Sequence, residues 1–477
     1  MRYEMLIDGE WRGAIHGGQW GVVNPATEGT VVDVPYGDAA DAAAAIAAAA
    51  AALPGWQALS VYERCAILAR VGEAILERLD ELARIMTQEC GKPLAEARGE
   101  WMATAYHFEW FAEEGKRAYG RVIPPRNLGK RYLVIRQPVG VVASITAWNF
   151  PALLASRKWA PALAAGCTVV GRPSELTPLC SMAIANLLVE AGLPPGVLNL
   201  INGEPAEQAA VFLASPQVAK ISFTGSQRVG RILMEGAAQN LQRLSLELGG
   251  SAPVLVCEDV DIDWAAAQAV AAKYRNNGQV CISPARFYVQ EPIYEDFLEA
   301  TAAAADRLTL GDGLEEGVTT GPLVTAAGRE KVQDFVADAL AKGAQLVTGG
   351  QRPAALSQGY FYEPTVMAQV TPAMKLGCDE VFGPVLAAST FQTLEDGLAQ
   401  ANRTPFGLAG FVLTHDMTTA VRAYEGLEFG IVGVNDLTPA TPEAPFGGVK
   451  QSGFGRESGQ EGLQGYLEPK LVSLGLA

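Results

Sequence analysis

Two side chains in the segment from Leu246 to Ser283 have the chemistry of a covalent catalyst. Cys281 closes the run Gly-Gln-Val-Cys, and Glu247 lies 34 residues earlier, just before a leucine and two glycines. A thiolate can hold an acyl group covalently, and a nearby carboxylate can activate the water that releases it. The segment therefore favours chemistry on a carbonyl carbon.

Each residue alone also fits a structural role. Free cysteine is often a small buried hydrophobe, and a glutamate often caps a helix or pairs with a cation. The apolar neighbours Leu246 and Leu248 predict that Glu247 is desolvated, which raises the pKa of the carboxyl and makes it a better base near neutrality. The choice between the two roles depends on the rest of the chain.

Length, composition and charge predict a folded, soluble protein with two large domains. The chain has 477 residues, of which 49% are hydrophobic and 18% charged. A formal charge of −16 disfavours nucleic acid and anionic membranes as partners. The first residues lack a secretory signal, and the apolar run 42–53 is too short to span a bilayer.

The cysteines and histidines argue against a disulfide framework and a metal site. Seven cysteines occur at wide, irregular spacings, so we expect a reducing, cytoplasmic location. The three histidines, His16, His107 and His415, have no cysteine or carboxylate at metal-ligand spacing, and we expect no metal. A thioesterase-like hydrolase is conceivable, but no histidine in a local motif accompanies Cys281.

Strand and helix patterns alternate over most of the chain. Short strands are expected before residue 36, helices from 38 to 119, and an exposed strand excursion at 120–138 that invites pairing with another subunit. Apolar strands separated by helices of ten to fifteen residues then predict two parallel, doubly wound sheets. The first has strands at 141–147, 167–171, 197–201, 219–223 and 243–248, and the second at 253–257, 286–290, 364–369, 385–391 and 409–413.

Two strand ends in the first sheet could bind a dinucleotide. The turn Phe223-Thr224-Gly225-Ser226 opens a helix, with Gly230 following, and there glycine and free N–H groups suit a pyrophosphate. A plain strand-to-helix turn is the alternative. In Arg172-Pro173-Ser174-Glu175 the glutamate can bind ribose hydroxyls and would repel a 2′-phosphate, whereas the arginine acts the other way. The pair favours NAD over NADP, and a helix-opening serine is the alternative.

Seven motifs, in order along the whole chain, resemble the aldehyde dehydrogenase superfamily. They are Trp148-Asn149-Phe150-Pro151, Arg172-Pro173-Ser174-Glu175, Phe223-Thr224-Gly225-Ser226, Leu246-Glu247-Leu248-Gly249-Gly250, Gly278-Gln279-Val280-Cys281, Glu380-Val381-Phe382-Gly383-Pro384 and Pro445-Phe446-Gly447-Gly448. Each motif alone is weak, whereas the ordered set is highly specific.

The resemblance implies NAD(P)-dependent oxidation of an aldehyde to an acid. Cys281 would be the nucleophile, Glu247 the general base, and the Asn149 amide an oxyanion donor. The family commonly has lysine at position 172 and often at 251, where this chain has Arg172 and Ser251, so the choice between NAD and NADP stays open. The cofactor-binding residues implied are Trp148, Arg172, Ser174, Glu175, Gly225, Ser226, Gly230, Glu380 and Phe382.

Within the superfamily, the segment 109–125 and two arginines look like succinate semialdehyde and 2-oxoglutarate semialdehyde dehydrogenases. Arg157 and Arg275 would bind the distal carboxylate of the substrate, a task that suits guanidinium geometry. Thr441 and Phe446 are further candidate substrate contacts. Some succinate semialdehyde enzymes have a second cysteine two residues after the nucleophile. Here that residue is Ser283, so we expect no disulfide switch.

The resemblance predicts the domain organisation. Residues 1–119 and 139–249 would form a dinucleotide-binding domain, 250–450 a catalytic domain, and 120–138 with 451–477 the oligomerisation strands of a homodimer or homotetramer. Four alternatives stay open: oxidation of uncharged aliphatic or aromatic aldehydes, arginines with only structural roles, acyl transfer to coenzyme A, and a non-catalytic structural protein. The glutamate at 247, which the coenzyme A branch commonly lacks, disfavours the third, and the full catalytic set disfavours the fourth.

Overall fold

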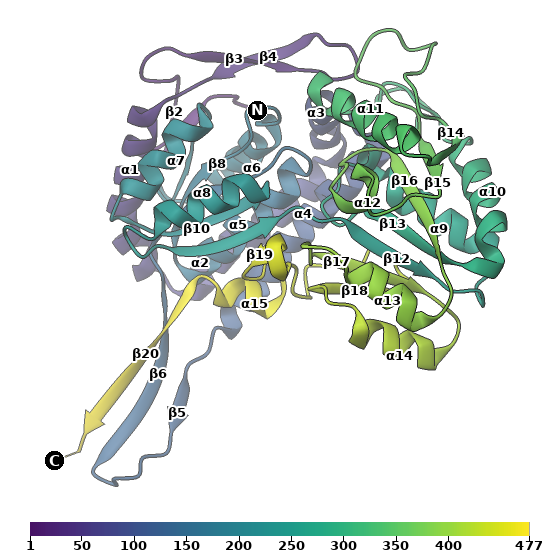
Figure 1. Cartoon of the computed structure of the whole chain (residues 1–477). Coiled ribbons are helices and arrows are strands. Elements are labelled where there is room, and N and C mark those ends of the chain that lie inside the picture. Colours follow the sequence, from purple (N-terminus) through teal and green to yellow (C-terminus); the bar gives the residue numbers. More distant parts are fainter. Residues whose placement is uncertain (477) are drawn as a thin grey trace.

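The computed structural model describes residues 1–476, which form two α/β lobes and a projecting β arm (Figure 1). The first lobe is built on an eight-stranded sheet with the strand order β19-β11-β10-β7-β8-β9-β1-β2. Its five central strands are parallel, and β19, β1 and β2 run antiparallel to their neighbours. The strands are β1 (Met5–Ile7), β2 (Glu10–Arg12), β7 (Val141–Ile145), β8 (Thr168–Arg172), β9 (Leu198–Leu200), β10 (Val218–Gly225), β11 (Arg243–Leu248) and β19 (Gly453–Phe454).

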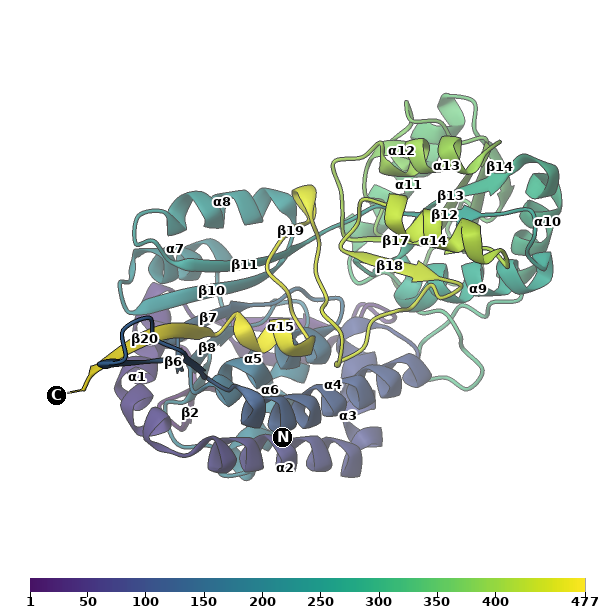
Figure 2. The same cartoon turned by 90° about the horizontal axis from the view of Figure 1, so that it is seen from below.

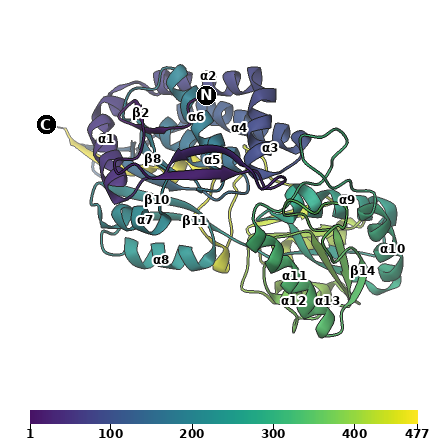
Figure 3. The same ribbon diagram turned by 90° about the horizontal axis from the view of Figure 1, so that it is seen from above.

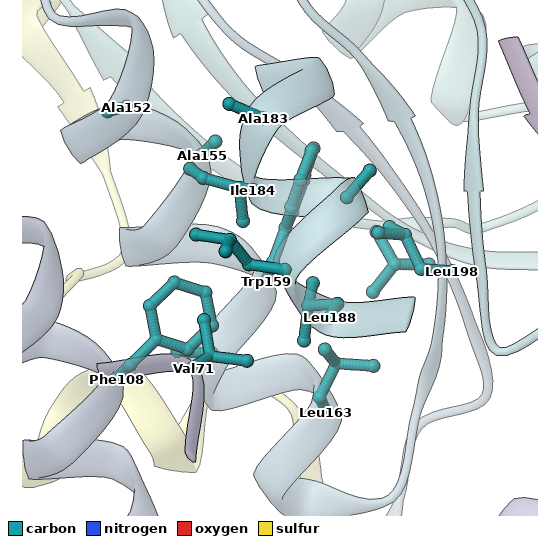
Figure 4. Close-up of a cluster of buried hydrophobic side chains, with 14 of the residues drawn as sticks. Val71, Phe108, Ala152, Ala155, Trp159, Leu163, Ala183, Ile184, Leu188 and Leu198 are labelled. Atoms are coloured by element: carbon teal, nitrogen blue, oxygen red, sulfur yellow. The ribbon is translucent and has the colours of Figure 1, made fainter. Parts of the chain in front are cut away.

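Helices cover the first sheet, and its central strands are therefore buried on both faces. Every residue of β7 and β8 is buried. Trp159 of α5 packs among apolar residues that include Phe108 and Leu188 (Figure 4), and the indole N–H donates to Ser144 Oγ at 3.1 Å. The helices are α1 (Ala39–Ala58), α2 (Val61–Glu77), α3 (Leu79–Cys90), α4 (Leu94–Glu114), α5 (Pro151–Ala165), α6 (Leu179–Glu190), α7 (Pro205–Ala214), α8 (Gln227–Ala237) and α15 (Gly459–Gln464).

Helix α1 is long and apolar enough, by length and composition alone, to cross a membrane. Its residues Ala42, Ala45, Ile46 and Ala49 are instead buried in the core of the first lobe. Asp38 begins the helix with a capping box, as expected for a helix that starts in water. Helix α1 is therefore a core helix of this lobe.

The second lobe is a seven-stranded sheet with the order β14-β15-β16-β13-β12-β17-β18. All neighbours are parallel except β14 and β15. Its strands are β12 (Ala252–Val256), β13 (Pro284–Gln290), β14 (Gln345–Thr348), β15 (Thr365–Ala368), β16 (Val385–Phe391), β17 (Ala409–Leu413) and β18 (Ile431–Val434). Its helices are α9 (Ile262–Tyr274), α10 (Tyr294–Ala305), α11 (Ala326–Ala341), α12 (Lys375–Cys378), α13 (Leu394–Asn402) and α14 (Met417–Gly426).

The predicted α/β class is confirmed, although both sheets are mixed rather than wholly parallel. The sequence did not predict β14 and β18, which lie at the two edges of the second sheet. Both are four residues long, and short edge strands leave little hydrophobic periodicity to detect. A separate two-stranded hairpin of β3 (Gln19–Val23) and β4 (Thr30–Pro35) is labelled at the top of Figure 1 and therefore faces the viewer, in dark purple, in the view from above (Figure 3).

The chain passes directly from one lobe to the other at the end of β11. Only Gly249, Gly250 and Ser251 separate the last residue of β11 from the first of β12 (Figure 2). A second connection returns from β18 to β19 and α15 on the first lobe. Residues near both crossings therefore lie between the lobes.

The arm is a three-stranded antiparallel sheet that projects from the first lobe (Figure 1). It consists of β5 (Arg121–Ile123), β6 (Lys130–Pro138) and β20 (Leu467–Gly475), and β20 pairs with β6 from Leu467↔Pro138 to Gly475↔Lys130. The strand excursion expected at 120–138 and the final strand therefore pair with each other within one chain. Residues 453–464 lie on the first lobe instead, so the arm uses only 467–475 of the segment 451–477.

Candidate active site

Cys281 lies where two cavities meet. The first cavity, of about 260 Å³, is lined by Asn149, Glu247 and Cys281, and the second, of about 280 Å³, by Arg157, Arg275 and Cys281. The structure therefore brings together the three predicted catalytic residues on one side of the sulfur. The two predicted arginines lie on the other side.

The backbone before Cys281 is strained and held by buried hydrogen bonds. After α9 the chain makes a 3-10 turn in which Asn276 and Asn277 both have left-handed conformations, with φ of 47° and 53°. Such residues cost on the order of 1–3 kcal/mol each and persist where their surroundings fix them. Here Asn276 N–H donates to Glu96 Oε2 at 2.7 Å, and Asn277 Nδ2 donates to Gly321 O at 2.9 Å. These contacts fix the loop that presents the sulfur.

Asn149 lies between β7 and α5 and is tied to the same loop. Its side-chain Nδ2 donates to Gln279 O at 3.1 Å, and its backbone carbonyl accepts from Lys92 Nζ at 3.0 Å and from Asn276 Nδ2 at 2.9 Å. The residue is 3% exposed and lines the first cavity. An amide held in this way is a preorganised donor for an oxyanion that forms beside Cys281.

Glu247, the second-last residue of β11, is a buried carboxyl. Neither carboxyl oxygen has a hydrogen-bond partner among the described residues. Burial raises the pKa of Glu247 to about 7, and Glu457 adds to the rise, whereas Lys158 and Arg157 oppose it. Lys158 pairs with Glu457 and donates to Thr224 Oγ1 at 2.7 Å. A carboxyl that titrates near pH 7 suits a general base.

The surroundings of Cys281 favour the neutral thiol. Burial raises the pKa of the thiol well above its usual value, and the neighbouring Glu247 raises it further, whereas Arg157 lowers it. Thiolate formation therefore requires a base, and Glu247 lines the same cavity. Acting on the thiol and later on water is compatible with a single carboxyl that titrates near neutrality.

The far part of the first cavity contains glycines, a helix N-terminus and a carboxylate. Strand β10 ends at Gly225, and Ser226 caps α8 by accepting from Val229 N–H at 3.4 Å. Glu380 Oε1 accepts from Gly250 N–H at 3.0 Å, and a Cβ on Gly249 would lie 2.3 Å from Glu380 Oε2. The glycine at 249 thus leaves room for the carboxylate to approach the backbone.

Two aromatic residues line this cavity beside Glu380. The rings of Phe382 and Trp148 meet edge to face with centroids 5.4 Å apart, and Phe382 has a left-handed backbone with φ of 53°. Burial raises the pKa of Glu380 to about 7. Two flat aromatic groups, a helix N-terminus and a ribose-binding carboxylate fit a nicotinamide dinucleotide.

The remaining predicted cofactor residues lie outside the lining of this cavity. At the end of β8, Arg172 Nη2 donates to Glu175 Oε2 at 2.8 Å and to Gly203 O at 2.7 Å, and Ser174 Oγ accepts from Leu176 N–H at 3.3 Å. Gly230 faces β11, because a Cβ there would lie 2.8 Å from Leu248 Cδ2. Gly230 therefore allows α8 to pack closely on the sheet.

The second cavity contains two guanidinium groups without acidic partners. Arg157 Cζ lies 4.0 Å from the centre of the Phe446 ring, and Arg275 Cζ lies 5.4 Å from that of Phe150. Among the described residues neither arginine forms a salt bridge, and the Nε of each is buried without a hydrogen-bond partner. Thr441 does not line the cavity, and its hydroxyl donates to Glu443.

Three charged residues of the second cavity escaped the sequence analysis. Lys92, Glu96 and Glu100 line the cavity, and the buried Lys92 pairs with the buried Glu100. Glu96 and Glu100 lie four residues apart on α4, a spacing that places helical residues on one face, and Lys92 lies just before the helix begins at Leu94. Burial of such a face could have been inferred from this spacing only with the tertiary packing in hand.

Comparison with known proteins agrees with this geometry. The model of the "Aldehyde dehydrogenase family" matches residues 11–472. The chain is 46% identical over 475 residues to succinate-semialdehyde dehydrogenase [NADP(+)] of Escherichia coli, covering 100% of this chain and 98% of the relative. It is 45% identical over 473 residues to glutarate-semialdehyde dehydrogenase of Pseudomonas putida, covering 99% and 98%.

A solved structure shows the same fold. The crystal structure of succinate-semialdehyde dehydrogenase from Burkholderia pseudomallei superposes with a TM-score of 0.98 at 45% identity, covering 99% of this chain and 98% of that one. The family match spans nearly the whole chain, and both lobes and the arm are included. The chain belongs to the aldehyde dehydrogenase family and is an NAD(P)-dependent aldehyde dehydrogenase.

Proposed function

We propose that this enzyme oxidises a semialdehyde that carries a carboxylate at its far end. The observation that carries the proposal is the pair Arg157 and Arg275, whose guanidinium groups line the cavity beside Cys281 without an acidic partner. Burying unpaired cations is costly, and a bound carboxylate would offset that cost. Relatives named for succinate and glutarate semialdehydes support a substrate of four or five carbons.

The residues of the two cavities give a sequence of roles. Glu247 takes the thiol proton, and the Cys281 sulfur attacks the aldehyde carbon to form a thiohemiacetal, whose oxyanion the Asn149 amide stabilises. A bound nicotinamide dinucleotide supplies the hydride acceptor that makes oxidation to a thioester possible. Glu247 passes the thiol proton to solvent and then removes a proton from water, which attacks the thioester carbon. The C–S bond breaks, the acid is released, and the Cys281 thiolate regains a proton.

We propose that the enzyme prefers NAD to NADP. Arg172 is engaged by Glu175 and by the carbonyl of Gly203, and Glu175 would repel a 2′-phosphate at the end of β8. The relative from Escherichia coli is named as NADP-dependent, so this preference is one of the features in which the two enzymes would differ.

We also propose that a second copy of the chain covers the arm. Both edge strands, β5 and β20, present unpaired backbone groups. The arm carries the exposed apolar residues Val122, Leu128 and Leu471, which are 72%, 83% and 63% exposed. Exposed apolar residues on free strand edges are typical of subunit contacts, so we expect a homodimer or homotetramer.

Hydrolysis of the acyl-enzyme should depend on the ionisation of Glu247. The raised pKa of about 7 means that the carboxyl is protonated and inactive below that pH and becomes an active base above it. The acylated Cys281 no longer titrates. In rapid-mixing experiments the rate of acid release should therefore rise with pH through about 7. Glu247→Gln should slow acid release by about 10²- to 10⁴-fold, and the NADH burst should slow as well because Glu247 takes the thiol proton. An unchanged steady-state rate would contradict the assignment.

Removing the two arginines should discriminate between charged and uncharged aldehydes. Arg157→Ala and Arg275→Ala should each raise KM for succinate semialdehyde by on the order of 10²-fold, because each removes a buried charge-assisted contact. KM for butanal should change little. Arg98→Ala, which breaks the exposed ion pair between Arg98 of α4 and Asp80 of α3, is the matched control. Equal effects on both aldehydes would refute the carboxylate site.

Cofactor preference should respond to Glu175. In Glu175→Ala the ratio of kcat/KM for NAD to that for NADP should fall by at least about tenfold, since the change removes a repulsive charge and frees Arg172 for a phosphate. Steady-state kinetics with both cofactors measures this ratio. Glu190→Ala, on the surface at the end of α6, should leave it unchanged. A wild-type enzyme that prefers NADP would rule out the proposed preference.

The arm should determine the oligomeric state. Light scattering of the wild-type enzyme should give two or four times the mass of one chain. Val122→Asp combined with Leu471→Asp should yield smaller species, because buried charges without partners destabilise an interface. Met417→Asp, at an exposed apolar position of α14, should not. A monomeric wild-type protein would contradict the proposal.

A further inference from the structure

The second cavity contains a carboxylate that the proposed reaction does not use. Glu96 lies on α4 and lines the cavity together with Arg157 and Arg275. Its Oε2 accepts from Asn276 N–H at 2.7 Å. Among the described residues, Oε1 has no hydrogen-bond partner and no cation lies within 4.0 Å of either oxygen, so Glu96 forms no salt bridge.

The other charged groups of the cavity determine what Glu96 contributes. Lys92 and Glu100 form a buried pair, which cancels their charges. His107 is neutral, because burial and the nearby Arg157 lower its pKa to about 3. Arg157 and Arg275 supply two positive charges and Glu96 one negative charge. The cavity therefore has one net positive charge to offer a ligand.

The surroundings of Glu96 act on its ionisation in both directions. Burial raises its pKa, and Glu100 adds to the rise. Lys92, the Asn276 N–H and Arg275 all lower the pKa. Burial is the largest of these effects and the pKa of Glu96 is raised overall, while the two cations and the backbone donor, which stabilise the carboxylate form, limit the rise.

We infer that Glu96 selects the charge of the substrate, so that the cavity accepts an aldehyde with one negative charge and rejects one with two. The inference rests on the proposed function, in which the arginines bind the anionic end. A carboxylate or sulfonate neutralises the net charge of the cavity. A phosphate dianion leaves one negative charge uncompensated beside Glu96 in a buried site, which is strongly unfavourable.

A charge-selecting role of Glu96 can be distinguished by experiment from a purely structural role in holding the loop that contains Asn276. A residue that only held Asn276 in place would affect every aldehyde equally, because all of them react with Cys281 on the same loop. A charge-selecting residue changes the ratio between substrates of different charge. Glu96→Gln keeps an oxygen that can accept from Asn276 N–H and removes only the charge.

The experiment compares kcat/KM for succinate semialdehyde, glyceraldehyde 3-phosphate and butanal, which carry one, two and no negative charges. The wild-type enzyme should prefer succinate semialdehyde to both others. In Glu96→Gln the ratio for the phosphate aldehyde relative to butanal should rise by at least about tenfold. Glu96→Asp keeps the charge and should keep the wild-type discrimination. Glu109→Gln, at an exposed position of α4, should match the wild type.

Three results would overturn the inference. Equal changes for all three aldehydes in Glu96→Gln would leave Glu96 with only a supporting role. The same loss of discrimination in Glu96→Asp as in Glu96→Gln would show that shape, not charge, is selected. A wild-type enzyme that used the phosphate aldehyde as well as succinate semialdehyde would also exclude charge selection. Failure of the proposed function looks different, since the wild-type enzyme would then oxidise butanal as well as succinate semialdehyde.

Discussion

The burial of the Glu247 carboxyl without a hydrogen-bond partner is the constraint on which the site depends. An unpaired buried carboxyl costs stability, and a fold designed only for stability would pair or replace it. Burial also has a chemical effect. It raises the pKa of Glu247 to about 7, where the carboxyl can both take and release a proton. The Lys158–Glu457 pair lies behind it and adjusts that pKa from both directions.

The arrangement of the two lobes follows from this constraint. Glu247 lies near the end of a strand of the first lobe, and Cys281 follows a helix of the second, so the proposed base and the proposed nucleophile meet only where the lobes face each other. Gly249 lets the chain cross between the lobes while Glu380 approaches its backbone. The sulfur then separates a cavity suited to a dinucleotide from a cavity suited to an anion.

Sequence reasoning worked where a local pattern carried the information. Strands such as β7 and β11 are short apolar runs between helices, and the turn at Gly225 and Ser226 has a composition that specifies its structure. The candidate catalytic residues were found through motifs that resemble those of the superfamily. Their convergence on one cavity is a tertiary fact, and only the coordinates show it.

The residues that escaped prediction depend on packing. In the sequence Glu96 looks like an ordinary charge on a helix face and Lys92 like a charge in the turn before that helix. Only the structure places both beside the loop that presents Cys281. Thr441 was expected in the substrate cavity because it precedes the Phe446 loop, yet the loop turns its hydroxyl towards Glu443. Arg172 and Glu175 were predicted as opposing influences, and their ion pair could not be foreseen from adjacency alone.

In the proposed reaction the Cys281 sulfur holds the substrate covalently, as a thioester, at the point where the two cavities meet. Rapid acid quenching of the wild-type enzyme during turnover with succinate semialdehyde and NAD, followed by digestion and mass spectrometry, tests it most directly. We expect the peptide that contains Cys281 to gain the mass of one succinyl group, and no other cysteine peptide to gain it. Turnover with that peptide unmodified, or with the acyl group on another residue, would contradict it.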